Sequence, residues 1–201
     1  KWIRRQHIFL AIKWRCTMDF KEKLQVYSEY SKGKSNQECQ LIYEDITIEN
    51  FDFTGYELND SKFLCVTFIK CTFDSVYCSR SNFSGSELVN CIFINNELQK
   101  ATWDFIDVYD TLFHNLNAFR TDFFDINLNN CKFEKCIFTK CNFTRLENAE
   151  IKNVVFNLCD FDTVNFKDCV FHNVIFEKCK FQNTKLEEKI TGVKFIKCSY
   201  S

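Results

Sequence analysis

The chain has 201 residues, no proline and nearly balanced charges, with a formal net charge of −1. Phenylalanine contributes 24 residues and cysteine 13, whereas glycine contributes only four. No apolar run reaches the ~18 residues that a membrane span needs. The longest apolar run near the start, residues 8–12, is also too short for the core of a signal peptide.

The cysteines follow neither a disulfide nor a metal-binding pattern. Their number is odd, none has C-x-x-C spacing, and the histidines His7, His114 and His172 lie far apart. A zinc site is not expected, because structural zinc sites use closely spaced cysteine and histidine pairs. We expect free, buried thiols, which fit a reducing cytoplasm, and no metal or cofactor.

The N-terminal region, residues 1–45, lies outside the repeat described below. Residues 1–18 hold five Lys or Arg and no acid, and fit an interaction arm, a non-native extension or a leader translated upstream of Met18. From Asp19 to Tyr30, apolar residues at three- and four-residue spacing predict a short amphipathic helix. Because a solenoid needs its hydrophobic end covered, we expect this helix to be a cap.

Beyond this region, large residues recur at every fifth position, a period that fits neither a helix nor a strand. Phe93, Leu98 and Trp103 show the spacing. We call each large residue the centre of a five-residue unit. The centres run without a slip over residues 48–143, resume over residues 151–186 and end with Phe195 and Tyr200.

A smaller residue precedes each centre by two positions, and the other positions of the unit are mostly polar. Nine of the 13 cysteines occupy this slot, which explains them as small apolar packing residues. The small slot includes Cys71, Val76, Ser81, Cys91, Ala101, Cys131, Cys136, Cys141, Val154, Cys159, Val164, Cys169, Val174, Cys179 and Cys198.

This pattern resembles the pentapeptide-repeat family, whose unit is often written A-(D/N)-L-x-x. Residues 81–85 (SNFSG), 121–125 (TDFFD) and 141–145 (CNFTR) match that unit directly. The resemblance implies an all-β fold, a right-handed quadrilateral β-helix in which four units make one coil. It covers residues 46–200 and predicts about seven to eight coils, a rod of roughly 35 Å at strand spacing.

Centres that lie twenty residues apart share their character, as stacked coils require. Such segregation is what a filled, close-packed interior needs. Two columns are aromatic: Phe53, Phe73, Phe93, Phe113 and Phe133; and Phe63, Phe83, Trp103, Phe123 and Phe143. Two others are aliphatic or mixed: Ile48, Phe68, Leu88, Val108 and Leu128; and Leu58, Cys78, Leu98, Ala118 and Phe138.

The repeat is interrupted twice, at residues 144–148 and 187–192. Each interruption fits either a tolerated kink or a short functional loop on a regular scaffold. No phosphate-binding glycine loop, nucleophile elbow or metal-binding helix motif occurs. Outward carboxylates such as Asp160 and Asp162 lack a cleft that would shift their pKa values, so we do not expect an enzyme.

Charge is unevenly distributed along the predicted rod. Residues 46–130 contain 12 Asp or Glu and 5 Lys or Arg, a net charge of −7, whereas residues 131–201 carry a net charge of +3. Against this trend, four cations share one slot twenty residues apart: Arg80, Lys100, Arg120 and Lys140. This basic ladder is either a row of solvated side chains or a binding stripe for an anion or acidic partner.

Outward aromatic residues flanked by carboxylates form a second candidate site. Phe105, Phe119 and Phe124 are expected to cluster near one corner, with Tyr109 on the adjoining face. Such a group is typical of a protein contact, or of rings lying flat over a twisted corner. The candidate partner-binding residues are Asp104, Phe105, Asp107, Tyr109, Asp110, Phe119, Asp122, Phe124 and Asp125.

Three functions fit these features. Similarity to the cytoplasmic Qnr-like and microcin-immunity members implies a homodimer through C-terminal coils. Those members mimic DNA and protect or inhibit DNA gyrase or topoisomerase IV, in some cases conferring resistance to quinolones or topoisomerase poisons. The alternative is an interaction scaffold or effector module that binds through the aromatic and acidic corner. Direct nucleic-acid binding through the basic ladder is the least favoured hypothesis.

Overall fold

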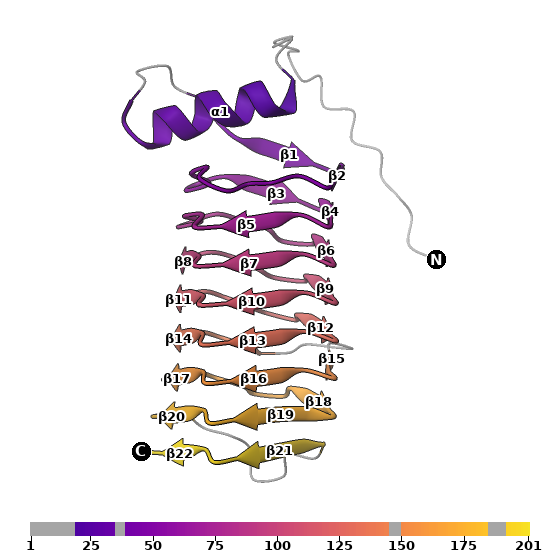
Figure 1. Cartoon of the computed structure of the whole chain (residues 1–201), viewed down its shortest axis with the longest axis vertical. Coiled ribbons are helices and arrows are strands. Elements are labelled where there is room, and N and C mark those ends of the chain that lie inside the picture. The colour runs from indigo at the N-terminus through magenta and orange to yellow at the C-terminus, as the bar shows by residue number, and fades with distance from the viewer. Residues whose placement is uncertain (1–18, 35–38, 145–149, 185–191) are drawn as a thin grey trace.

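The computed structural model describes residues 19–34, 39–144, 150–184 and 192–201. Over these residues, one helix, α1 (Phe20–Ser31), lies across the end of a four-sided rod of short strands (Figure 1). All strand pairs are parallel, and two of the sheets have seven strands each, so the rod has about seven coils. The predicted quadrilateral β-helix with an N-terminal helical cap is confirmed.

The four sides of the rod are named by their order along each coil. Face 1 consists of β2 (Thr47–Glu49), β4 (Thr67–Ile69), β6 (Glu87–Val89), β9 (Asp107–Tyr109), β12 (Asn127–Asn129), β15 (Glu150–Lys152) and β18 (Val170–His172). Face 2 consists of β5 (Thr72–Asp74), β7 (Ile92–Ile94), β10 (Leu112–His114), β13 (Lys132–Glu134), β16 (Val155–Asn157), β19 (Val174–Glu177) and β21 (Val193–Ile196).

Face 3 consists of β8 (Glu97–Gln99), β11 (Asn117–Phe119), β14 (Ile137–Thr139), β17 (Asp160–Asp162), β20 (Lys180–Gln182) and β22 (Ser199–Tyr200). Face 4 is less regular. It begins with β1 (Ile42–Glu44) and β3 (Lys62–Leu64) and continues as single bridges, such as Asn82 with Thr102 and Thr102 with Asp122.

The register of the strands confirms the twenty-residue coil. Phe113 pairs with Phe93 on one side and Phe133 on the other. Across the first interruption the partner spacing is 23 residues, since Phe133 pairs with Phe156, and it then returns to 20, since Phe156 pairs with Phe176. After the second it becomes 19, since Phe176 pairs with Phe195. The second interruption therefore shortens its coil by one residue. Most residues of both interruptions, and the expected centre Leu186, lie outside the described residues.

The interior is a set of stacked rings. Phe113 and Phe133 have centroids 4.5 Å apart and planes within 4° of parallel, and the centres over residues 53–181 are almost fully buried where described. This confirms that every fifth side chain points inward. Offset stacking of aromatic rings adds to the burial of their apolar area.

The small slot also provides hydrogen bonds, which the sequence pattern did not predict. Many of its polar side chains donate a hydrogen bond to the carbonyl of a centre in the preceding coil. The Cys131 thiol donates to the Val108 carbonyl at 3.5 Å, and the Ser86 hydroxyl donates to the Phe63 carbonyl at 2.9 Å. Buried Asn96 uses both ends of its amide, because Nδ2 donates to Phe73 and Oδ1 accepts from the Val76 N–H, both at 2.9 Å. These bonds satisfy polar groups that burial would otherwise penalise.

Each corner is made by a residue two positions after a centre, which adopts a left-handed backbone conformation. Asn and Asp fill many of these positions, for example Asn130 with a φ of 55°, because they tolerate this region better than most residues. Arg80 and Phe105 also occupy it, with φ values of 56° and 57°. Their side chains therefore project from the edges of the rod.

Helix α1 closes the open end of the first coils. Asp19 caps its start by accepting a hydrogen bond from the Glu22 N–H at 2.8 Å. Leu24 is fully buried, and the Phe20 ring lies edge-on to Phe51 with centroids 4.9 Å apart. The helix is much too short to cross a membrane, and no other helix occurs among the residues described.

Candidate functional site

The acidic residues of the N-terminal half gather on two adjoining faces. Within residues 46–130, faces 1 and 4 and the corners that end them carry seven of the twelve acids but only two of the five bases, Lys62 and Lys70. We call this surface the acidic side. Its acids are Glu49, Glu87, Asp104, Asp107, Asp110, Asp122 and Asp125.

Two aromatic rings, the exposed Phe105 and the half-buried Phe124, mark the edge where face 4 meets face 1. Phe105 is 53 % exposed, and its ring lies perpendicular to that of Phe124 with centroids 5.4 Å apart. The backbone N–H of Phe105 donates to the Phe124 carbonyl at 2.8 Å, so both residues are held by the coil ladder. We call these two residues the aromatic corner.

Carboxylates next to the aromatic corner are held in fixed positions. Asp104 is half-buried and accepts a hydrogen bond from the Phe124 N–H at 3.2 Å. Burial raises the pKa of its carboxyl, and the nearby charge of Asp122 raises this pKa further. Asp125 occupies the corner slot of Phe105 one coil later and also has polar or charged partners.

On face 1, two acids of the acidic side are tied to the next coil. Asp107 accepts from the Asn127 amide at 2.6 Å, and Asp110 accepts from the Asn130 amide at 3.1 Å. Tyr109 is half-buried in register with Val89 and Asn129. Burial raises the pKa of its hydroxyl, and Asp107 adds to this shift. The surface is thus rigid before any partner binds.

Phe119 does not join the aromatic corner, which corrects the expected cluster of three rings. It follows the centre Ala118 on face 3, whereas Phe105 and Phe124 belong to face 4. The Arg120 guanidinium lies over the Phe119 ring, 5.2 Å from its centroid. Among the described residues no ring contact joins Phe119 to the other two.

The basic ladder occupies the edge between faces 3 and 4, and it is only partly compensated. Arg80 forms a two-pronged ion pair with Asp60, its neighbour one coil earlier, at 2.5 and 2.6 Å. Arg120 is covered on one side by Phe119. Lys100 and Lys140 have no ion pair within the part of the chain that is described. The ladder is therefore a stripe of three cations below one neutralised pair.

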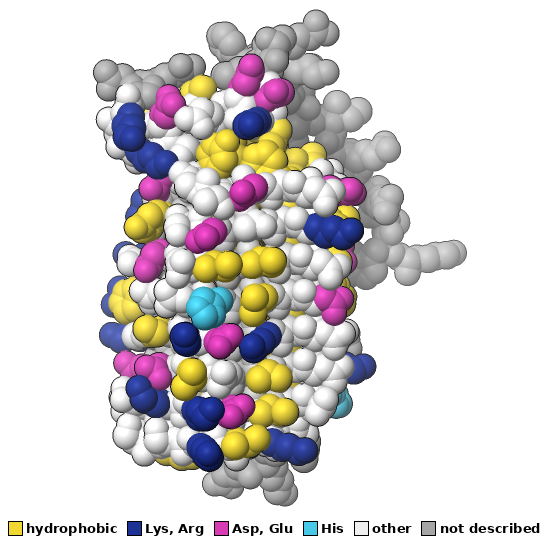
Figure 2. All heavy atoms as spheres, in the orientation of Figure 1, with side chains coloured by type: hydrophobic (Ala, Val, Ile, Leu, Met, Phe, Trp, Pro, Cys, Tyr) yellow, Lys and Arg dark blue, Asp and Glu magenta, His cyan; other side chains and the backbone are white. Residues whose placement is uncertain are grey.

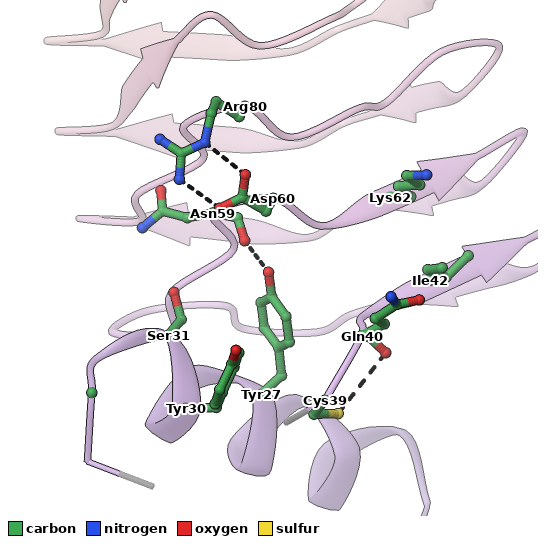
Figure 3. Close-up of a pocket in the computed structure, with 11 residues that line it drawn as sticks. Tyr27, Tyr30, Ser31, Cys39, Gln40, Ile42, Asn59, Asp60, Lys62 and Arg80 are labelled. Carbon is green, nitrogen blue, oxygen red and sulfur yellow. Dashed lines mark hydrogen bonds and ion pairs between the residues drawn. The ribbon is translucent and has the colours of Figure 1, made fainter. Parts of the chain in front are cut away.

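A polar hollow of about 770 Å³ lies between α1 and the first coil (Figure 3). The Tyr27 hydroxyl points from the helix to the rod and donates to the Asn59 carbonyl, with the Arg80–Asp60 pair at the rim. Burial raises the pKa of Tyr27 to about 12. These contacts hold the cap helix on the rod. No sequence motif predicted the hydrogen bond between Tyr27 and Asn59.

Metal ligands are not brought together. Within the residues described, no three His, Cys, Asp or Glu side chains are arranged to hold a metal ion. His114 and His172 are outward, as expected, and each lies near a glutamate, Glu134 at 3.7 Å and Glu150 at 3.9 Å.

A parallel, four-sided β-helix of five-residue units with a continuous aromatic interior defines the class of this protein. A family model described as pentapeptide repeats (9 copies) matches residues 128–180. Over these residues the chain matches the pentapeptide-repeat family. Among curated protein sequences, no match to it was found.

Several solved structures are similar to this chain at low sequence identity. HetL, involved in heterocyst differentiation regulation in the cyanobacterium Nostoc sp. strain PCC 7120, is 12 % identical with a TM-score of 0.40, covering 90 % of this chain and 94 % of HetL. Trypsin-treated QnrB1, a plasmid-mediated fluoroquinolone resistance protein, is 16 % identical with a TM-score of 0.27, covering 81 % and 92 %. Rfr23 of the cyanobacterium Cyanothece 51142 is 12 % identical with a TM-score of 0.32, covering 88 % and 99 %.

Proposed function

We propose that this chain is a non-enzymatic binding protein. Its acidic side binds to the surface with which a partner protein binds duplex nucleic acid. Type II topoisomerase, either DNA gyrase or topoisomerase IV, is the partner to test first. The observation that supports this proposal is the gathering of seven of twelve acids on faces 1 and 4, where hydrogen bonds hold several of them in place.

The net charge per unit length of the acidic side is close to that of one DNA strand and somewhat less than half that of the duplex. Its seven acids and two lysines give a net charge of −5, spread over four coils that span about 20 Å at strand spacing. That is one net charge in about 4 Å, compared with one in about 1.7 Å for duplex DNA and 3.4 Å for one of its strands. A rigid acidic rod of this kind can attract a DNA-binding groove without any chemistry.

The aromatic corner adds an apolar anchor to this electrostatic surface. Phe105 is exposed beside Asp104 and Asp125, so a partner can bury the ring while pairing its cations with the carboxylates. Exposed aromatic residues often contribute most of the binding energy at a protein interface. In this proposal the protein acts in the cytoplasm and protects or inhibits the topoisomerase, with resistance to a quinolone or topoisomerase poison as one outcome.

We further propose that the active form is a homodimer joined through the C-terminal coil. Phe195, Ile196 and Tyr200 are 39 %, 41 % and 60 % exposed on the last coil, an apolar surface that a second copy would bury. Sedimentation of the protein at several concentrations tests this contact. A monomer at micromolar concentration contradicts the dimer but leaves the binding proposal intact.

The binding proposal is tested by gyrase supercoiling assays with matched charge variants. Asp107→Asn, Asp110→Asn and Asp122→Asn together remove three charges from the acidic side. Asp74→Asn, Asp160→Asn and Asp162→Asn remove the same charge from faces 2 and 3. We expect the wild-type protein and the second variant to change the supercoiling rate, and the first variant to lose this effect. If micromolar wild-type protein leaves the supercoiling rate unaltered, the proposal is wrong.

The second candidate function is an interaction scaffold or effector module that uses the aromatic corner against a different protein. It is favoured if Phe105→Ser and Phe124→Ser abolish capture of a lysate protein other than a topoisomerase. Ile137→Ser on face 3 is the control, since Ile137 is 44 % exposed and lies away from the corner.

A further inference from the structure

Face 2 displays an outward row of aliphatic side chains (Figure 2). Ile92, Leu112, Val155 and Ile175 occupy the position just before the centre, with Ile94 beside Ile92. Lys132 holds this position in the coil between Leu112 and Val155, so the row consists of two aliphatic pairs on either side of one lysine. Ile92 is 38 % exposed, and the others are half-buried at the surface. Contiguous exposed apolar patches on a folded protein mark places where other molecules bind.

The C-terminal half of face 2 is also basic. Lys132, Lys135, Lys178, Lys194 and Lys197 lie on this face or on its edge with face 3, together with only two acids, Glu134 and Glu177. Among the described residues from 131 onward, the remaining faces hold four lysines and four acids. All the net positive charge of the described C-terminal half is therefore on face 2.

The two acids of face 2 are already paired. Glu134 accepts from Lys132 at 3.1 Å, and Glu177 lies 3.2 Å from Lys178. Within the described chain, Lys135, Lys194 and Lys197 have no carboxylate within ion-pair distance. Face 2 thus combines an apolar row with uncompensated cations.

The spacing of the coils is close to the pitch of an α-helix. Neighbouring parallel strands lie about 4.8 Å apart, and one turn of an α-helix advances 5.4 Å. A helix lying along the rod would place one turn over each coil, with a mismatch of about 2 Å after four coils. Its apolar stripe would meet the aliphatic row, and acidic residues beside that stripe would meet the lysines.

We propose that face 2 is a docking surface for an acidic amphipathic helix from a partner protein. A membrane surface is less favoured, because described face 2 carries no exposed tryptophan or tyrosine, the residues that anchor proteins at the lipid interface. This site differs from the acidic side in position and in the sign of its charge, and it does not depend on topoisomerase binding.

The experiment uses the full chain and three probes. The first is a labelled synthetic helix of about 20 residues, ~30 Å long, with leucine along one stripe and glutamate on both flanks. The second has lysine in place of glutamate, and the third is a phosphatidylserine vesicle. We expect the acidic helix to bind with an affinity that falls as salt is raised. Equal binding of the lysine helix, or binding of the vesicle alone, overturns the proposal.

Variants locate the binding to face 2. Lys135→Glu with Lys178→Glu reverses two charges on the edge of face 2, and we expect at least a tenfold loss of affinity, or about 1.4 kcal/mol. Lys140→Glu with Lys180→Glu makes the same change on face 3 and should alter affinity less than about twofold. Ile92→Thr with Ile175→Thr should also weaken binding, whereas Ile137→Thr should not. Equal effects of a variant and its control contradict the assignment, and circular dichroism checks that all variants fold.

Discussion

The inside and the outside of this rod follow different rules. Inside, every fifth residue is large and buried, and the pattern hardly changes between coils. Outside, neighbouring faces differ in character, since the acidic side carries carboxylates and two rings while face 2 carries aliphatic residues and lysines. The interior therefore specifies the fold, and the exterior slots are left to vary with the partner.

The largest expected effect comes from opening the interior. Phe113→Ala removes a ring that stacks between Phe93 and Phe133, and we expect it to cost about 3–5 kcal/mol. Phe105→Ala, on the outside, should cost about 1 kcal/mol or less. Urea denaturation of both variants measures the difference. Similar losses would contradict the separation of interior from exterior.

Alkaline pH tests the buried thiols of the interior. Burial raises the pKa of Cys131 and Cys141 to about 11 each, above the ordinary thiol value near 9. The unfolded chain therefore loses its thiol protons at a lower pH than the folded chain does. The contribution of the protonated thiols to the free energy of unfolding is fully present below pH 9 and is lost as pH rises through 11. At pH 11 the loss is about 2 kcal/mol for each thiol.

The measurement is a series of urea denaturation curves between pH 8 and 11. Cys131→Ser with Cys141→Ser, which removes these two thiols, should lessen the loss of stability above pH 9, and Cys78, whose pKa is also raised by burial, contributes to what remains. An unchanged pH dependence in this variant would assign the loss to other groups. The tyrosines Tyr27 and Tyr43, with pKa values raised to about 12, contribute only above about pH 10.

A smaller effect is expected where the interior meets the cap. Tyr27→Phe removes the hydroxyl that donates to the Asn59 carbonyl, and we expect a loss of about 1 kcal/mol. Tyr30→Phe is the control, because Tyr30 is 37 % exposed. Hydrogen exchange resolved along the chain should show faster exchange in α1 for the first variant only. Unchanged exchange would show that apolar packing alone holds the helix.

The smallest effect concerns the exterior ladder. Lys100→Glu places a carboxylate between Arg80 and Arg120, and it should stabilise the chain by roughly 0.2–1 kcal/mol at low salt. The gain should disappear at high salt because screening weakens exposed charge pairs. Lys100→Gln, which only removes the cation, should give a smaller gain. Destabilisation by Glu would show that the ladder is not strained by repulsion.

The periodicity of the sequence was enough to predict the interior. The spacing of Phe93, Leu98 and Trp103 predicted the buried centres, the small slot and the outward faces, and Asp19 marked the start of the cap helix. The four-sided coil was implied by the resemblance to the pentapeptide-repeat family. Features that depend on how side chains bend around an edge were not predicted. The separation of Phe119 from Phe105 and Phe124, the Arg80–Asp60 pair and the hydrogen bonds of the Cys131 thiol depend on which face and which coil a side chain reaches.

The change of register after the first interruption has a practical consequence. Phe113 and Phe133 are twenty residues apart, yet Phe133 and Phe156 are 23 apart and pair in the same way. Three additional residues are thus accommodated at one edge of the rod, and the centres of the coils before and after them remain stacked. An insertion of this size at an edge therefore leaves the axial height of the following strands unchanged, and such an edge is a suitable place to graft a short peptide.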